Sequence, residues 1–370
     1  MIKSCIGTVR EILYQDEVLC KFAALIGCEE TKCINYVKLT GEIQTGDRVL
    51  LNTTAVELKL GSGGYHFVIA NMSRPEIENL DEGHIMKLRY TPFQINFMTA
   101  EAQESPYHQF FKDFTSLEGL PVLLGSLHSM LAPCCIYLKK RKPDIKICYI
   151  MTDGGALPLY LSDTVRALRR EGLLDATVTY GNAFGGDMEC VNIYTSLIAA
   201  KKIAKADIVM VSMGPGIVGT DTPYGFSGIE QGSIGDAVNK LGGCPLFIPR
   251  ISFADKRTRH WGLSHHSITI LKDICCTKMN VVFPILQDEK YLNVINRQME
   301  ENRLGSLHNI YYVDLIDVIS DLREYKGYLN RMGCDYEQDP AYFITCASVA
   351  KYGLQMLFNS GSPDRREPLA

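Results

Sequence analysis

A polar segment from Arg250 to His266 carries the residue types best suited to chemistry. It contains an aspartate, several cationic side chains and three of the eight histidines of the chain. Imidazole and carboxylate groups can move protons or bind a metal ion, and guanidinium groups can neutralise a bound anion. The candidate residues of this segment are Arg250, Asp255, Arg257, His260, His265 and His266. A solvated polar loop with one histidine packed in the core is the alternative interpretation.

The sequence also predicts how two of these histidines are placed. Ser264 is a good N-cap, so His265 and His266 would occupy the first turn of a helix, where the helix dipole disfavours an imidazolium. A neutral imidazole can act as a general base or as a metal ligand. Adjacent residues on a helix point in different directions, so we expect at most one of the two to meet a ligand held by His260.

Three further segments place glycines directly after a run of apolar residues. Glycine lets the backbone approach a ligand closely and lets N–H groups point inward, which suits an anion. The candidate ligand-binding and catalytic residues here are Asp153, Gly154 and Gly155, then Gly185, Gly186 and Asp187, then Gly214, Gly216 and Gly219. A structural turn and helix-capping aspartates are the alternatives. His128, after another apolar run, either joins the same site or has a capping or packing role.

The elements that position these residues alternate between short apolar runs and longer helical patterns. This alternation predicts a doubly wound, mostly parallel, Rossmann-like α/β sheet with helices on both faces. The carboxyl ends of parallel strands meet at one edge, so the four loops are expected to share one site. The predicted strands are 121–125, 146–151, 176–180, 207–212, 245–251, 280–285 and 310–315.

The first ninety residues have a different character, with turns between short β-like runs. The stretch 46–60 ends in alternating apolar and polar residues and is followed by the glycine-rich segment 61–64, which predicts a hairpin with 65–69. These residues indicate a small antiparallel β barrel or sandwich that precedes the α/β domain. The expected domains are a β domain at 1–90, a connecting segment at 91–119, an α/β domain at 120–358 and a disordered tail at 359–370.

Composition excludes several classes of protein. The formal charge of −4, the pI near 6.1 and the absence of a basic block longer than Lys139–Lys142 argue against a nucleic-acid partner. No apolar stretch reaches the roughly eighteen residues of a membrane span, and the N-terminus does not resemble a signal peptide, so we expect a cytoplasmic protein. The thirteen cysteines are scattered without a CxxC pair and are expected to be reduced. A homo-oligomer is left open.

The motifs that the chain lacks exclude some classes of reaction, but no motif identifies the reaction itself. The chain lacks the dinucleotide fingerprint, a Walker loop and a serine nucleophile elbow, so a dinucleotide-dependent oxidoreductase is the weakest hypothesis. The first hypothesis is a hydrolase or group transferase for a small anionic, phosphorylated or nucleotide-like molecule, with arginines neutralising its charge. Its histidines and carboxylates would move protons or hold a divalent metal ion as the cofactor. The alternative is a non-catalytic metabolite-binding or regulatory protein, whose β domain presents a surface to a partner.

Five segments, in order along the chain, resemble a bacterial family catalogued as domain of unknown function 3866. The resemblance implies a bacterial origin and one shared architecture over nearly the whole chain, and it implies no particular reaction. The segments are GSLHSMLAP (125–133), YIMTDGGALPLYLSDTVRALR (149–169), AFGGDMECVNIYTSL (183–197), MGPGIVGTDTPYGFSGIEQG (213–232) and PRISFADKRTRHWGLSHHSITIL (249–271).

Overall fold

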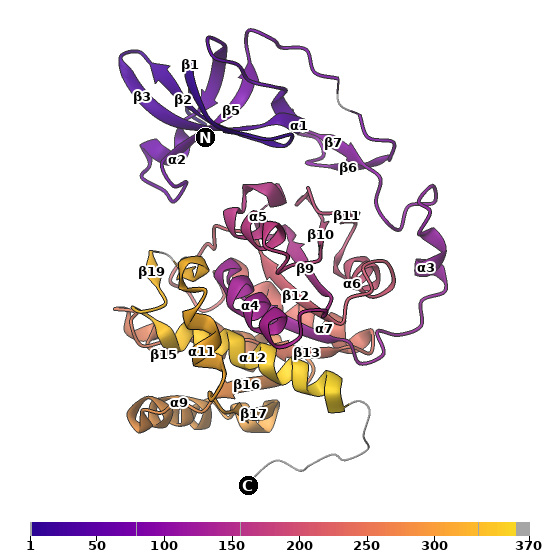
Figure 1. Ribbon diagram of the computed structural model, residues 1–370, viewed down its shortest axis with the longest axis vertical. Coiled ribbons are helices and arrows are strands. Elements are labelled where there is room, and N and C mark those ends of the chain that lie inside the picture. Colours follow the sequence, from indigo (N-terminus) through magenta and orange to yellow (C-terminus); the bar gives the residue numbers. More distant parts are fainter. Residues whose placement is uncertain (1, 79, 156, 332, 360–370) are drawn as a thin grey trace. The chain divides into compact units, whose positions relative to one another are not determined.

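The chain folds into two compact units, Met1–Phe97 and Met98–Ala370 (Figure 1). The computed structural model describes residues 2–78, 80–155, 157–331 and 333–359. The division between the units falls inside the segment 91–119 that the sequence suggests as the connection. The tail expected at 359–370 lies, from residue 360 onward, outside the described residues.

The first unit contains a closed five-stranded barrel, as the sequence predicts for this part of the chain. The strands follow the order β1-β2-β3-β5-β4, with β3 and β5 parallel and the other neighbours antiparallel. Register shifts in β1 next to Val9 and Ile12 bend the strand and help the barrel to close. The strands are β1 (Ser4–Gln15), β2 (Leu19–Ile26), β3 (Glu29–Tyr36), β4 (Arg48–Asn52) and β5 (Tyr65–Asn71).

The expected hairpin is present as β4 and β5, but its first strand is shorter than predicted. Residues Thr54–Glu57 form a short helix, α2, because the Asn52 side chain accepts a hydrogen bond from Thr54 N and turns the chain. The other elements of this unit are the helix α1 (Val37–Thr40) and the hairpin of β6 (Ile85–Lys87) and β7 (Ile95–Phe97).

The second unit is built on an eight-stranded sheet in which all neighbouring strands are parallel, which confirms the predicted α/β fold. Its order is β11-β10-β9-β12-β8-β13-β16-β17. Every residue of β9 and β12 is buried, as expected for strands that helices cover on both faces. The strands are β8 (Pro121–Gly125), β9 (Ile147–Thr152), β10 (Ala176–Tyr180), β11 (Met188–Cys190), β12 (Ile208–Met213), β13 (Cys244–Phe247), β16 (Asn280–Pro284) and β17 (Asn309–Val313).

Helices pack in two groups against this sheet. Right-handed crossovers place α4 on one face of the sheet and α6 and α7 on the other. Helices α11 and α12 pack against α4, whereas α6 packs against α7. Among the described residues, no helix is long and apolar enough to cross a membrane. The helices are α3 (His108–Lys112), α4 (Leu131–Arg141), α5 (Asp163–Arg170), α6 (Ile193–Lys202), α7 (Gln231–Lys240), α8 (His265–Thr269), α9 (Glu289–Glu301), α10 (Leu304–Leu307), α11 (Val318–Arg323) and α12 (Pro340–Asn359).

The strand order creates two places where the connections that follow neighbouring strands diverge. The chain leaves β9 toward β10 but leaves the adjacent β12 toward β13, on the other side. In the same way it leaves β8 toward β9 and leaves the adjacent β13 toward β16. Ligands of open parallel sheets bind at the carboxyl ends of strands at such switch points. The topology therefore predicts that a ligand would bind near the segments that follow β8, β9, β12 and β13.

Candidate functional site

The segments that follow the strands touch one another in a continuous series along the carboxyl edge of the sheet. Asp153, after β9, accepts hydrogen bonds from backbone N–H groups of the segment after β10, at distances of 2.7 and 3.2 Å. Thr152, at the end of β9, donates to Glu230 in the segment after β12. That segment in turn contacts the histidines after β13, because Phe226 stacks on His266. The four predicted loops thus lie next to each other.

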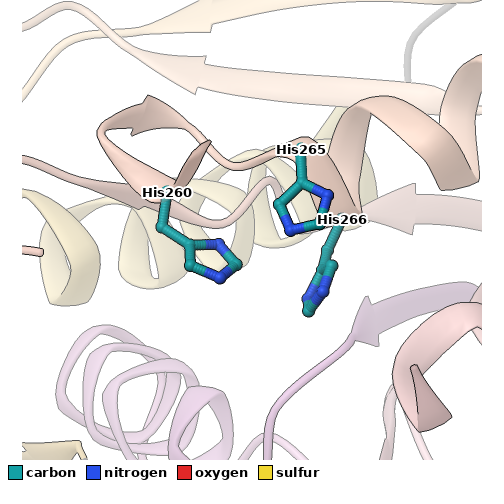
Figure 2. A group of neighbouring side chains, drawn as sticks. All are labelled: His260, His265 and His266. Carbon is teal, nitrogen blue, oxygen red and sulfur yellow. The ribbon is translucent and has the colours of Figure 1, made fainter. Parts of the chain in front are cut away.

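Three histidines cluster in the segment that follows β13. His260 ends the short 3₁₀ turn η5 (Thr258–His260), and His265 and His266 begin α8. The three rings lie side by side (Figure 2), and their centroids are 4.3 to 4.9 Å apart. Each ring offers a nitrogen, and these nitrogen atoms lie within 4.8 Å of one another. The sequence predicts that at most one of the two helical histidines meets a ligand held by His260, whereas the rings of both lie close to the ring of His260. The first helical turn has no preceding turn to restrict its rotamers, so both side chains can converge.

Each histidine ring has a different local environment. His260 Nδ1 lies 2.7 Å from Ser264 Oγ, and the ring is buried. The ring of His266 is stacked on Phe226 with centroids 3.9 Å apart and planes 5° apart. His265 is half-buried, and its Nε2 has no hydrogen-bond partner among the described residues. Ser264 is the N-cap of α8, as the sequence predicts, since its side chain accepts from His266 N.

Burial and nearby cations keep the three imidazoles neutral. Burial, reinforced by Arg250 and Arg257, lowers the pKa of His260 to about 3. Burial, reinforced by His265 and Arg250, lowers the pKa of His266 to about 3 as well. The pKa of His265 is also lowered, first by burial and then by Arg259. At neutral pH each ring therefore keeps a nitrogen lone pair. The sequence predicts neutral rings from the helix dipole, and burial and the nearby cations act in the same direction.

A ribbon and an ion-pair network hold the segment that carries His260. The strands β14 (Ile251–Ser252) and β15 (Gly262–Leu263) pair in an antiparallel ribbon, and residues 253–261 connect them. Asp255 binds Arg257 through both carboxylate oxygens, at 3.0 and 2.9 Å, and lies 3.3 Å from Arg250. These contacts hold the pKa of the Asp255 carboxyl well below its usual range, with the Arg257 hydrogen bond as the largest cause. The carboxylate of Asp255 therefore orients arginines around the histidines.

Sequence reasoning missed three contributors to the edge. Arg331, in β18 (Asn330–Arg331), lies 3.2 Å from Asp339 and 3.9 Å from Asp255, so a distant segment completes the ion-pair network. Phe226 supports the ring of His266. Glu230 ends the 3₁₀ turn η4 (Ser227–Glu230), and burial followed by the nearby Asp153 carboxylate raises its pKa. Phe226 and Glu230 both lie in the motif 213–232, where a carboxylate among glycines was the available signal.

The glycines after β9 and β12 lie where a side chain would meet neighbouring groups. A Cβ at Gly154 would lie 3.4 Å from Oε1 of Glu230, and one at Gly214 would lie 3.0 Å from Sδ of Met151. A Cβ at Gly219 would lie 3.9 Å from Cε1 of His266, so this part of the loop approaches the histidines. Gly216 has φ +103° with open space around it, and Gly155 lies beside Leu157. A side chain at Gly154, Gly155 or Gly214 would therefore meet neighbouring groups, and the close approach of these glycines to a ligand stays a prediction.

The structure places the segment after β10 apart from the histidines. The carboxylate of Asp187 accepts from Thr177 N at 2.8 Å and pairs with Arg169 at 3.1 Å, near the start of β10, which is the opposite end of the strand. The backbone N–H groups of Gly185 and Gly186 already donate to Oε1 of Glu189 and to Oγ1 of Thr179. The chain turns back here to pair β11 with β10, so these three candidates support the fold of the loop.

His128 follows β8, and its contacts hold neighbouring elements of the fold together. Its Nε2 lies 2.6 Å from Ser162 Oγ and its Nδ1 lies 3.1 Å from Tyr149 Oη. Burial lowers the pKa of His128 to about 4. The ring thereby joins β8, β9 and the N-cap of α5, and both of its nitrogens are engaged.

The thirteen cysteines are free thiols, and several are deeply buried, including Cys134, Cys135 and Cys148. Burial raises the pKa of the Cys135 thiol to about 12, so it is protonated and unreactive at neutral pH. The group of potential metal-binding residues that the described part of the chain brings together consists of histidines alone.

Comparison with known proteins places the chain in a family. Among curated proteins, none matches it. A family model described as a protein of unknown function (DUF3866) matches residues 32–350, which include strands β4 and β5 of the barrel, the whole parallel sheet and all three histidines. This match spans most of the 370 residues, and the chain therefore belongs to the DUF3866 family.

Proposed function

We propose that the protein is a hydrolase or group transferase that acts on a small anionic, phosphorylated or nucleotide-like molecule at the carboxyl edge of its parallel sheet. The observation that carries this proposal is the convergence of neutral imidazoles and guanidinium groups on one short segment. Arg257 and Arg259 are partly exposed, so their charges are accessible to a ligand. Guanidinium groups bind phosphate and carboxylate oxygens through paired hydrogen bonds and stabilise developing negative charge.

The buried carboxyl group of Glu230 supports a reaction as well as binding. The raised pKa of Glu230 makes its carboxyl a suitable proton donor, and Thr152 fixes its orientation. Glu230 lies at the switch point between β9 and β12, where ligands of such sheets bind. A proton donor at one part of the edge and imidazole ligands at another are groups that hydrolysis or group transfer can use.

One observation favours the second candidate, a metabolite-binding protein without turnover. A general base works best when its pKa lies near the working pH, and the pKa values of His260 and His266 are about 3. Imidazoles of this kind accept protons weakly. They therefore serve either as ligands of a bound group or as uncharged walls of a binding site.

A product-release assay distinguishes the two candidates. The purified protein would be incubated with nucleotides and sugar phosphates, and product would be measured by liberated phosphate and by chromatography. We expect turnover of at least one phosphorylated compound, a loss of roughly 100-fold or more in His260→Gln, and a raised KM in Arg257→Gln. His108→Gln is the matched control, since His108 lies on α3 and bonds Glu101 O. Ligand-induced thermal stabilisation without product, unchanged in His260→Gln, would instead identify a metabolite-binding protein.

A further inference from the structure

We propose that His260, His265 and His266 form a binding site for one divalent transition-metal ion of the zinc class. Imidazole nitrogen is a preferred ligand of zinc, and zinc sites of enzymes commonly use three protein ligands and leave a fourth position open for water or substrate. The three histidines supply one nitrogen each, within 4.8 Å of one another. The role of the ion in catalysis rests on the proposed function, whereas the binding of the ion does not.

The spacing of the rings suits a metal ion better than direct contact between the rings. Zinc–nitrogen bonds of about 2.0 to 2.1 Å place tetrahedral ligand atoms about 3.4 Å apart. The nitrogens here are up to 4.8 Å apart, so small side-chain rotations would bring them around a central ion.

A buried nitrogen without a partner is an independent sign of a missing ligand. Nε2 of His265 is shielded from solvent and has no hydrogen-bond partner among the described residues. A buried polar atom that lacks a partner costs free energy, and such atoms in native proteins often mark the place of an ion or a water molecule. A metal ion bound by Nε2 would remove this cost.

The other two rings are already oriented by neighbouring residues. With Nδ1–H of His260 donating to Ser264 Oγ at 2.7 Å, its Nε2 keeps a lone pair for the ion. A hydrogen bond from the second ring nitrogen is the usual support of a metal-binding histidine. His266 is held by its stacking on Phe226. The site is thus preorganised by residues outside the ligand set.

The nearby arginines do not prevent a cation from binding, because carboxylates pair with them. Asp255 pairs with both Arg250 and Arg257 and offsets part of their charge, and Asp221 pairs with Arg259 at 2.7 Å. The residual positive field favours an anion as the fourth ligand, either hydroxide or an oxygen of an anionic substrate. Metal and arginines would then bind opposite sides of the same substrate group.

The test measures metal binding directly. The full-length protein would be stripped with a chelator and titrated with Zn²⁺ and with Co²⁺, with bound metal quantified by mass spectrometry and Co²⁺ coordination followed by visible absorption. We expect one ion per chain in the wild type and in His108→Gln, and a loss of 100-fold or more in affinity in His260→Gln and His265→Gln. His265→Gln removes no hydrogen bond of Nε2, so this variant is expected to fold, which circular dichroism would check.

The outcomes separate this proposal from the proposed function. Equal metal affinity in the wild type and His265→Gln, or no stoichiometric binding by the folded wild type, would overturn the metal site. Tight binding that His265→Gln abolishes, without turnover of any phosphorylated compound, would support the metal site and count against the enzyme. Turnover that survives chelation and His265→Gln would support the enzyme and refute a catalytic role of the ion, and the metal titration would still decide whether the site exists.

Discussion

Ser264 connects two of the three histidines through one hydroxyl group. Its oxygen accepts a hydrogen bond from His266 N at 3.3 Å and lies 2.7 Å from Nδ1 of His260. The first contact caps α8 and the second fixes the ring of His260, so one small side chain sets both the backbone and the geometry of the cluster. Ser264 is therefore a positioning residue, whereas the histidines themselves are the groups that would touch a ligand.

Replacing Ser264 with alanine should weaken metal binding more than it weakens the fold. Loss of the cap is expected to lower the free energy of unfolding by about 1 kcal/mol. Loss of the support of His260 is expected to lower metal affinity roughly 10- to 100-fold. Denaturant unfolding and metal titration measure these two effects separately. Unchanged metal affinity, with the expected loss of stability, would show that Ser264 acts only as a cap.

At the scale of elements, a short ribbon depends on an ion-pair network that spans distant parts of the sequence. Asp255 lies between β14 and β15 and is almost fully buried together with Arg250 and Arg331. Asp339, next to the start of α12, accepts from Ser252 Oγ at 2.8 Å and pairs with Arg331. The network ties the ribbon to β18 and α12, and the attraction offsets the cost of burying these charges.

Removing the charge of Asp255 should destabilise the second unit strongly. Asp255→Asn leaves Arg250 and Arg331 with less compensation in a buried place, which typically costs about 3 to 5 kcal/mol. Asp221→Asn is the matched control, because Asp221 is mostly exposed and its pair with Arg259 should contribute less than about 1 kcal/mol. Urea unfolding of both variants tests this expectation. Equal stabilities of the two variants would contradict it.

The elements themselves could be predicted because their signals are local. The buried strands β9 and β12 appear as continuous apolar runs, and the polar segments that follow them are visible in the sequence. Contacts between distant segments leave no such signal. Arg331 lies far along the chain from Asp255, and nothing near it indicates a pairing. Asp187 follows β10 in the sequence, but its loop turns back to the opposite end of that strand.

Sequence spacing alone also could not predict that the rings of His265 and His266 converge. Their directions depend on rotamers in the first turn of α8, and Phe226, from the segment after β12, helps to fix one of them. Sequence reasoning could therefore place the histidines on one segment, while tertiary contacts decide that three rings face each other.

At the scale of the whole chain, buried neutral histidines couple the stability of the second unit to pH. His128 joins three elements of the sheet edge, and burial lowers its pKa to about 4, compared with 6.5 for a free side chain. A histidine with a lowered pKa in the folded state binds its proton more readily after unfolding. Its contribution to stability is therefore complete above pH 6.5 and is lost as the pH falls from 6.5 through 4.

We expect the free energy of unfolding of the metal-free protein to fall as the pH is lowered from 6.5 to 4. Near the middle of this pH range His128 contributes a slope of about 1.4 kcal/mol per pH unit, and over the whole range it contributes about 3 kcal/mol. Trp261 is the single tryptophan of the chain and lies in the second unit, so its fluorescence reports the unfolding of that unit. His128→Gln loses the two ring contacts and is less stable at neutral pH, but its stability should depend less steeply on pH. The difference in slope is the decisive measurement, because lost hydrogen bonds alone would lower stability equally at every pH. Parallel slopes in the two proteins would show that His128 does not take up a proton when the second unit unfolds.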